Sequence, residues 1–268
     1  MPIEHTFQIQ PVSDDEFHAL DYNVMSLVFA MHNAMGRLWS EPVYQHELAY
    51  RCREAGFEKV DIEAPIRVSY RDFHKTLYAD LLLNDAVLYE LKAVQTLLGE
   101  HQQQTLTYLL LLGMPHGKLV NLRPPSVESR FVSTRLRPAK RYDFAVDDRE
   151  WRSLDEESLE LKQLVENLLN DWGAFLDTAL FYDAVIHFRG GKENVIKPVK
   201  VMNGSRFLCM QKTHLLNPET AFKFSSLTQD RKSYEQQLRR FLHFTSLKTI
   251  QWINFNHHHI EFKTLLRE

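Results

Sequence analysis

The sequence predicts an α/β protein whose chain repeats one order of helices and strands. Three observations predict this fold class. Amphipathic helical patterns alternate with short runs rich in Val, Ile, Leu and Tyr. The pair Asn84-Asp85 suits a tight turn and joins two apolar runs, which is typical of a β-hairpin. The two halves align without a gap from Leu88 to the end when one is displaced by 133 positions. We therefore expect two units, each a mixed sheet flanked by helices.

The composition is that of a folded, water-soluble chain. Its 268 residues allow one large domain or two of ordinary size, and 44% are hydrophobic and 25% charged. A formal net charge of -3 gives no global basic signal, so nucleic-acid binding would depend on local patches. Cys52 and Cys209 do not have the spacing of metal ligands. The first residues are too acidic for a signal peptide, and the apolar runs are too short to span a bilayer. We expect a cytoplasmic protein without a membrane segment.

The first half begins with two predicted helices. Ser13 is placed as an N-cap with Glu16 three residues later, and apolar residues then recur at helical spacing up to Gly36. A second helix has Pro42 in its first turn and ends near Gly56. The elements expected after it are strands at Ile66–Tyr70, Leu77–Leu83 and Ala86–Ala93, a helix at Gly99–Gly113, and strands at Lys118–Leu122 and Val127–Ser133. This order predicts a sheet with helices on its faces.

A charged segment separates the halves. Residues Arg135–Asp155 contain Pro138 and lack sustained periodicity, so we expect domains at 1–135 and 156–268 joined by a linker at 136–155. Basic residues in this segment could contact phosphates, although a solvated linker is the simpler interpretation. The second half predicts helices at Glu156–Asn170, Phe175–Phe188 and Ser233–Phe244, and strands at Val195–Met202, Ser205–Leu216, Thr220–Ser226, Lys248–Asn254 and Ile260–Leu265.

Charged residues interrupt the apolar hairpin of the first half. Asp80 lies on its first strand, and Glu90 and Lys92 lie two residues apart on its second, on the same face. Pairing across the turn brings the two carboxylates together. Burying unpaired carboxylates costs several kcal/mol, and Mg2+ or Mn2+ would remove that conflict. The alternative is a strand whose charged residues face solvent, with Lys92 paired to Glu90.

The second half keeps the scaffold pattern and loses these charges. The coincident polar pairs are Gln104 with Gln237, Asn121 with Asn254, and Glu128 with Glu261. The pairs that differ are Glu90 with Lys223, Lys92 with Ser225 and, after a one-residue gap, Asp80 with His214. We therefore expect a duplication in which the second copy is degenerate and lacks the metal-site residues.

The order Asp80, Glu90-Leu91-Lys92, Gln104 and Tyr108 resembles that of the PD-(D/E)XK nuclease superfamily. The similarity covers about residues 20–133 and, within the superfamily, is closer to the GxxExxY family. The segments that carry it are His32–Gly36, Leu38–Tyr44, Tyr78–Leu81, Glu90–Ala93, His101–Leu109 and Asn121, which resemble the family's V-H-x-x-L-G, naming, R-x-D-L, E-L-K-A, H-x-x-Q-x-x-x-Y-L and L-x-N-F motifs. Leu38 stands where the naming motif has Gly.

The resemblance implies a restriction-endonuclease-like core with a metal site in the first half. Together with the internal repeat, it predicts one active and one inactive half. Asp80 and Glu90 would hold Mg2+ or Mn2+, and the backbone carbonyl of Leu91 would add a ligand. Glu41 would supply a carboxylate to the metal or its water. Lys92 would orient or activate the attacking water and stabilise charge on the phosphate.

The resemblance also implies roles for the following helix and a substrate class. Gln104 would position Lys92 or the scissile phosphate, and Tyr108 and His101 would contact the substrate, although Tyr108 could simply pack. The substrate would be nucleic acid, DNA rather than RNA. One site per chain would cut one strand, unless two chains form a homodimer. The alternative is a non-catalytic scaffold that binds nucleic acid or protein on an inactive nuclease fold.

Overall fold

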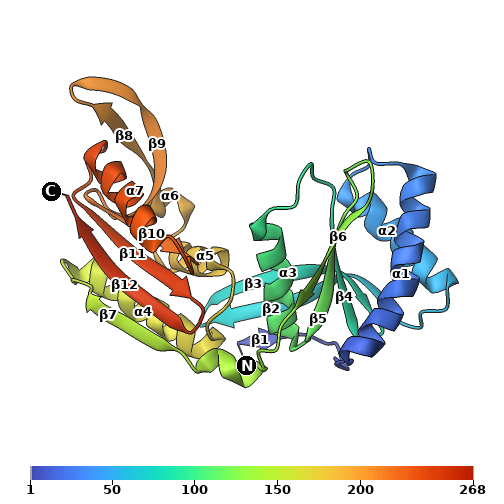
Figure 1. Ribbon diagram of the computed structural model, residues 1–268. Helices are drawn as coiled ribbons and strands as arrows, with labels where there is room; N and C mark the ends of the chain where they lie inside the picture. The colour runs from blue at the N-terminus through green and yellow to red at the C-terminus, as the bar shows by residue number, and fades with distance from the viewer. Residues whose placement is uncertain (1, 268) are drawn as a thin grey trace. The chain divides into compact units, whose positions relative to one another are not determined.

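The computed structural model describes residues 2–267, and the chain divides into two compact units, Met1–Lys140 and Arg141–Glu268 (Figure 1). The first unit contains β1 (Ile3–Glu4), α1 (Asp14–Met35), α2 (Glu41–Glu54), β2 (Val60–Tyr70), β3 (Phe73–Leu83), β4 (Val87–Lys92), α3 (Gly99–Leu112), β5 (His116–Asn121) and β6 (Glu128–Ser133). Its strands form one sheet in the order β1-β2-β3-β4-β5-β6. Neighbours in this sheet are antiparallel except β4 and β5, which are parallel.

Local sequence signals determine the ends of α1 and of the hairpin, as predicted. The Ser13 hydroxyl and the Glu16 carboxylate form a capping box at the start of α1. Asn84 and Asp85 both have positive φ, 51° and 52°, as the two central residues of a type I′ turn do, and the Ala86 amide donates to the Leu83 carbonyl at 2.9 Å. The sequence therefore correctly predicted the β3–β4 hairpin.

The core that covers one face of the first sheet determines where the charged residues point. Leu81, Tyr89 and Leu91 are fully buried in a cluster with side chains of α1 and α2. Glu90 and Lys92 alternate with these residues along β4, so they project from the opposite face. Helix α3 lies on that opposite side (Figure 1).

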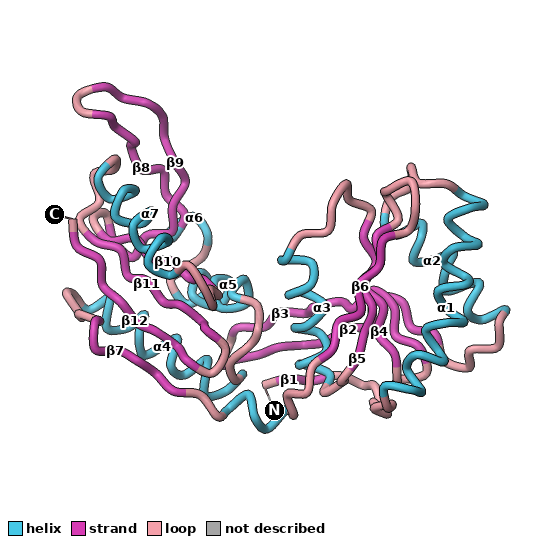
Figure 2. The backbone as a smooth tube through the Cα atoms, viewed as in Figure 1, coloured by secondary structure: helices cyan, strands magenta, loops and turns pink. Residues whose placement is uncertain are grey.

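The second unit has its own sheet. The short 3-10 helix η1 (Pro138–Tyr142) crosses the boundary between the units. The elements after it are β7 (Ala145–Glu150), α4 (Glu156–Trp172), α5 (Thr178–Phe188), α6 (Lys192–Val195), β8 (Ile196–Asn203), β9 (Arg206–Asn217), β10 (Thr220–Ser225), α7 (Arg231–His243), β11 (Thr249–Asn256) and β12 (His259–Leu266). The strands lie in the order β7-β12-β11-β10-β9-β8 (Figure 2). Strand β10 is parallel to β11, and the other pairs among β8 to β12 are antiparallel. Strands β8 to β12 therefore have the order and directions of β2 to β6.

Part of the expected linker is structured. Within 136–155, Pro138–Tyr142 forms a short 3-10 helix and Ala145–Glu150 forms β7, which pairs in parallel with β12. The division between the units falls at residue 140 rather than 135. The sequence did not predict β7, because it is an edge strand in which five of the six residues are exposed and apolar residues do not alternate with polar ones.

The strand registers of the two units agree with the offset of 133 positions. The pairs Leu88 with Gly117 and Lys92 with Asn121 join β4 to β5, and Ala221 with Ile250 and Ser225 with Asn254 join β10 to β11. The antiparallel neighbours of these strands correct one detail, since Leu88 pairs with Leu82 and Ala221 with Leu215. Asp80 lies two residues before Leu82 on β3, and Thr213 lies two residues before Leu215 on β9. Thr213, and not His214, therefore takes the place of Asp80, and the expected gap is unnecessary.

One side-chain contact recurs at the same offset. Asn121 accepts a hydrogen bond from the Val94 amide (3.1 Å) and donates one to the Val94 carbonyl (2.8 Å). Asn254 makes the same pair of bonds with Leu227, at 2.8 and 2.9 Å. Each asparagine fixes the loop that leaves the preceding parallel strand.

We expect Asn121→Ala and Asn254→Ala each to lower the free energy of unfolding by about 1–3 kcal/mol, because each leaves backbone groups of the loop without partners. Urea denaturation measures this loss. Asn203→Ala, at the exposed end of β8, is the control and should change stability by less than about 0.5 kcal/mol. An unchanged Asn254→Ala would show that the recurring contact is not structural.

Candidate active site

Strands β3 and β4 bring three charged side chains together inside the first unit. Lys92 Nζ lies 2.7 Å from Glu90 Oε1 and 4.0 Å from Asp80 Oδ2. Glu90 is fully buried, and Asp80 and Lys92 are also buried. Lys92 does pair with Glu90, but the solvent-facing alternative is wrong because the pair is inside the protein.

Glu41 joins this group from the first turn of α2. Its Oε1 lies 3.7 Å from Lys92 Nζ. The segment before α2 is held by Arg123, whose guanidinium donates to the carbonyls of Arg37 (3.0 Å), Trp39 (3.2 Å) and Ala93 (3.1 Å). Arg123 thus connects the start of α2 to the end of β4. Sequence reasoning missed it, since a single arginine in a loop carries no pattern.

Gln45 is a second residue that the sequence interpretation missed. Its Nε2 donates to Asp80 Oδ1 at 2.7 Å, and the Leu91 amide donates to Asp80 Oδ2 at 2.7 Å. Both oxygens of Asp80 are therefore fixed in direction. Gln45 follows Glu41 by four residues and so lies on the same face of α2. That spacing was the available signal.

Burial and mutual repulsion shift the titration of the carboxyl groups. Burial raises the pKa of Asp80 to about 6, against the opposing effects of Lys92 and the Leu91 amide. Burial and then the Asp80 charge raise the pKa of Glu90 to about 8. Burial alone would lower the pKa of Lys92, but the carboxylates, Glu90 first, outweigh it and raise this pKa. The site therefore concentrates negative charge that one ammonium only partly compensates.

The oxygen donors of this site have the chemistry that a hard divalent cation requires. Glu90 Oε2 and Gln45 Oε1 are buried and have no hydrogen-bond partner among the described residues. Carboxylate and amide oxygens are the ligands that Mg2+ and Mn2+ prefer. Across residues 2–267 no group of three or more His, Cys, Asp or Glu side chains is gathered as a ligand set, and the Lys92 ammonium lies among the three carboxylates. These oxygen donors are of the type that binds a divalent metal ion, and in the structure the cation that the carboxylates contact is the Lys92 ammonium.

The predicted residues of α3 contact one another and the helix start. Gln104 Nε2 donates to the Tyr108 hydroxyl at 2.9 Å. His101 Nδ1 accepts from the Leu98 amide at 3.0 Å, which caps the helix. Within the described chain, the structure gives neither Gln104 nor His101 a hydrogen bond to Lys92.

In the second unit the corresponding positions form a neutral contact. Ser225, 133 positions after Lys92, donates from Oγ to Asn254 Oδ1 and accepts from Trp252 Nε1, both at 2.8 Å. Burial lowers the pKa of Lys223, which stands where the first unit has Glu90. These side chains supply no carboxylate to a metal.

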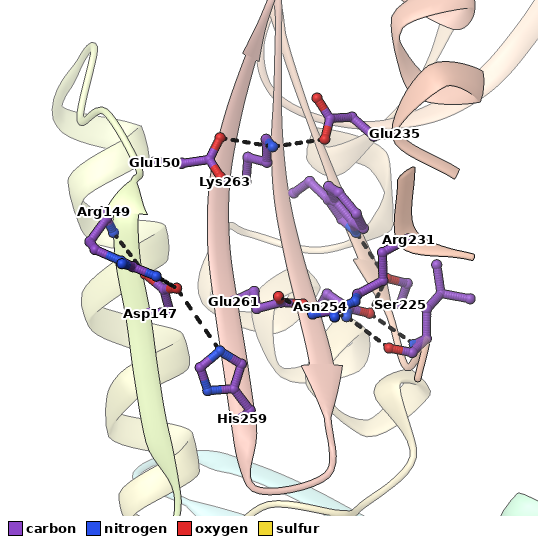
Figure 3. Close-up of polar contacts among 12 residues, drawn as sticks. Asp147, Arg149, Glu150, Ser225, Arg231, Glu235, Asn254, His259, Glu261 and Lys263 are labelled. Atoms are coloured by element: carbon purple, nitrogen blue, oxygen red, sulfur yellow. Dashed lines mark hydrogen bonds and ion pairs between the residues drawn. The ribbon is translucent and has the colours of Figure 1, made fainter. Parts of the chain in front are cut away.

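A cavity of about 590 Å³ lies beside these residues, lined by side chains of β7, β11, β12 and α7 (Figure 3). Lys263 Nζ bridges Glu150 and Glu235 at 2.8 and 2.7 Å, and Arg231 pairs with Glu261. The sequence did not reveal this cavity because its charges come from separate elements. Its acidic groups are already paired with cations, so it does not repeat the carboxylate cluster of the first unit.

Comparison with known proteins finds one match, and it lies in the first unit. Residues 18–132 match the family model described as PD-(D/E)XK nuclease superfamily. The matched range contains Asp80, Glu90 and Lys92 and agrees with the range expected from the motifs. Comparison with curated proteins and with solved structures finds no significant match. The match supports a nuclease-like function, for which superfamily members generally use divalent metals.

No helix within residues 2–267 has the length and apolar character needed to cross a membrane.

Proposed function

We propose that the first unit is a metal-dependent nuclease of the GxxExxY type, which hydrolyses phosphodiester bonds of DNA rather than RNA. The observation that carries this proposal is the buried convergence of Asp80 and Glu90 on Lys92, inside the range that matches the nuclease family model. Charged groups this deeply buried are costly to a fold and are typical of functional sites.

The carboxylates have the role of holding the metal. Asp80 and Glu90 would bind Mg2+ or Mn2+, with Glu41 and the Leu91 carbonyl as further oxygen donors. Such an ion supplies positive charge to the phosphate and lowers the pKa of a bound water. Gln45 and the Leu91 amide orient Asp80, which keeps its carboxylate in place before substrate arrives.

Lys92 would act as a hydrogen-bond donor in the reaction. In the metal-free site Glu90 and the neighbouring carboxylates raise the pKa of Lys92. As an ammonium it would orient the attacking water or stabilise negative charge on the phosphate. Gln104 would position the scissile phosphate, and Tyr108 and His101 would contact the nucleic acid. One such site cuts one strand; a homodimer would bring a second.

We also propose that the second unit is a degenerate copy of the first. The common order of five strands, the offset of 133 positions in the parallel strand pairs and the recurring asparagine contact support duplication. The loss of Asp80, Glu90 and Lys92 counterparts supports an inactive second half. Its scaffold persists without those charges, so they are not needed for the fold.

We expect saturating Mn2+ or Mg2+ to raise the melting temperature of the wild-type protein by about 5–10 °C, because the ion binds only the folded site. Asp80→Asn should remove this rise, and Asp15→Asn, an exposed change in α1, should keep it. Differential scanning fluorimetry with and without EDTA measures the shift. If no ion shifts the wild type and no DNA is cut, the non-catalytic scaffold replaces this proposal.

A further inference from the structure

Strands β8 and β9 form a two-stranded ribbon that extends beyond the rest of the second sheet (Figure 1). They pair with one another from Ile196 with His214 to Asn203 with Arg206, whereas β10 pairs with β9 only near its end, at Leu215 and Asn217. Gly204, with φ 60°, occupies the first central position of the connecting turn, as a type II′ turn requires. Most of β9 therefore has a free edge.

The ribbon exposes apolar side chains that a folded protein usually covers. All seven residues from Arg206 to Lys212 are exposed. Among them Phe207 is 53% exposed and Met210 is 48% exposed. Exposed apolar groups gathered on one element mark an interaction surface.

The ribbon is also purely basic. Its charged residues are Lys197, Lys200, Arg206 and Lys212, all exposed. No Asp or Glu occurs between Glu193 and Glu219, although the whole chain has a net charge of -3. None of the four basic residues forms an ion pair with a carboxylate in the described part of the chain. This is the local basic patch that nucleic-acid binding would need.

The strand register gathers charge and apolar surface on one side of the ribbon. Lys200 pairs with Met210 and Pro198 pairs with Lys212, and direct partners in a ladder project to the same side. Lys200, Lys212 and Met210 therefore share a face. On the other face Val199 is buried in the core with Leu238 and Leu242 of α7.

Strand β8 is fixed to its unit near the turn end of the ribbon. Val201 forms an isolated bridge with Thr245, and the Met202 amide donates to the Phe244 carbonyl at 2.8 Å. These contacts with the residues at the end of α7 hold the free face of the ribbon in a fixed orientation within the second unit.

We propose that the β8–β9 ribbon is a binding arm for duplex DNA. Lys200 and Lys212 contact phosphates from the shared face, Arg206 contacts a phosphate from the turn end of the ribbon, and Phe207 and Met210 contact the groove between them. A two-stranded ribbon fits the major groove of B-form DNA, whereas the major groove of A-form RNA is too narrow to admit it. The inference rests on the proposed function for nucleic acid as the partner, and the charge and shape of the ribbon select duplex DNA.

Fluorescence anisotropy with a labelled DNA duplex in EDTA tests this arm separately from cleavage. The triple variant Lys200→Ala, Arg206→Ala, Lys212→Ala should bind at least about tenfold more weakly, and the slope of log affinity against log salt should become shallower by about 2–3. Phe207→Ser should weaken binding without changing that slope. The matched control Arg135→Ala, Arg137→Ala, Lys140→Ala removes as many charges from the other basic segment and should bind within about twofold of wild type.

The outcomes separate the arm from the nuclease. Wild-type protein that binds no duplex at low salt, or a ribbon triple variant that binds like wild type, overturns the arm whether or not the protein cuts DNA. Equal losses in the ribbon and control triples also overturn it, because the effect is then one of net charge. A loss of duplex binding that is confined to the ribbon variant supports the arm. Cleavage that is unchanged by Asp80→Asn would remove the nuclease proposal and leave the arm standing. A ribbon variant that instead loses binding to anionic vesicles while keeping duplex binding assigns the ribbon to a membrane surface and contradicts the arm.

Discussion

We expect Lys92→Ala to lower the rate of metal-dependent DNA cleavage by about 10²–10³-fold, the loss typical when a preorganised donor to a developing negative charge is removed. Lys92 Nζ is the cationic atom in contact with Glu90 and within 4.0 Å of Asp80. Its loss removes both the donor to the phosphate and the charge that balances these carboxylates. Single-turnover cleavage of a labelled duplex at saturating Mn2+ measures the chemical step.

The fold should survive this change. The pKa values of Asp80 and Glu90 are already raised, so protonation can relieve the charge that Lys92 leaves behind. Lys92→Met, which retains the apolar stem, separates loss of charge from loss of volume and should be as inactive as Lys92→Ala. Lys223→Ala, a matched change in the second unit, should cut at the wild-type rate. Full activity in a folded Lys92→Ala would refute the catalytic assignment.

The hairpin and its charged residues were predictable because each signal is local. Asn84 and Asp85 determine the turn, and the turn with the alternation of β4 determines that Glu90 and Lys92 share one face. The same logic located most helices and strands in both units. Burial of the charges was not predictable from spacing, since the solvent-facing alternative has the same pattern.

Contacts between distant segments could not be predicted from local patterns. Gln45 reaches Asp80 across 35 positions, and Arg123 reaches Arg37 across 86. The orientation of α2 against the sheet determines both contacts, and no periodicity encodes it. The register of β9 was also missed, because a bulge next to Thr220 makes sequence alignment ambiguous there.

The second large effect concerns Glu90, whose buried carboxyl should make the metal-free protein less stable as pH rises. Its folded pKa of about 8 exceeds the ordinary value of 4.5, so the folded state binds more protons between these values. The free energy of unfolding then falls with pH across this window, by up to about 1.4 kcal/mol per pH unit. Asp80 adds a decline between 3.8 and about 6, and the raised pKa of Lys92 acts only above 10.5.

Glu90→Gln should remove the larger of these two declines in the free energy of unfolding. In EDTA we expect the variant and wild type to melt at similar temperatures near pH 5, and the variant to melt several degrees higher at pH 8. Parallel melting curves over this pH range would contradict the burial argument. Asp15→Asn, on the surface, should follow the wild type throughout.

Saturating Mn2+ should reverse this order at pH 8. The ion takes the place of the proton on Glu90, so the ionised carboxylate that destabilises the metal-free fold becomes a ligand, and binding stabilises only the wild type. Wild type should then melt above Glu90→Gln, which gains nothing from the ion. A variant that stays more stable in Mn2+ would mean that Glu90 is not a ligand. The crossing would show that one buried residue lowers stability without metal and raises it with metal. Such a residue is costly to the metal-free fold, and that cost is expected of a functional site.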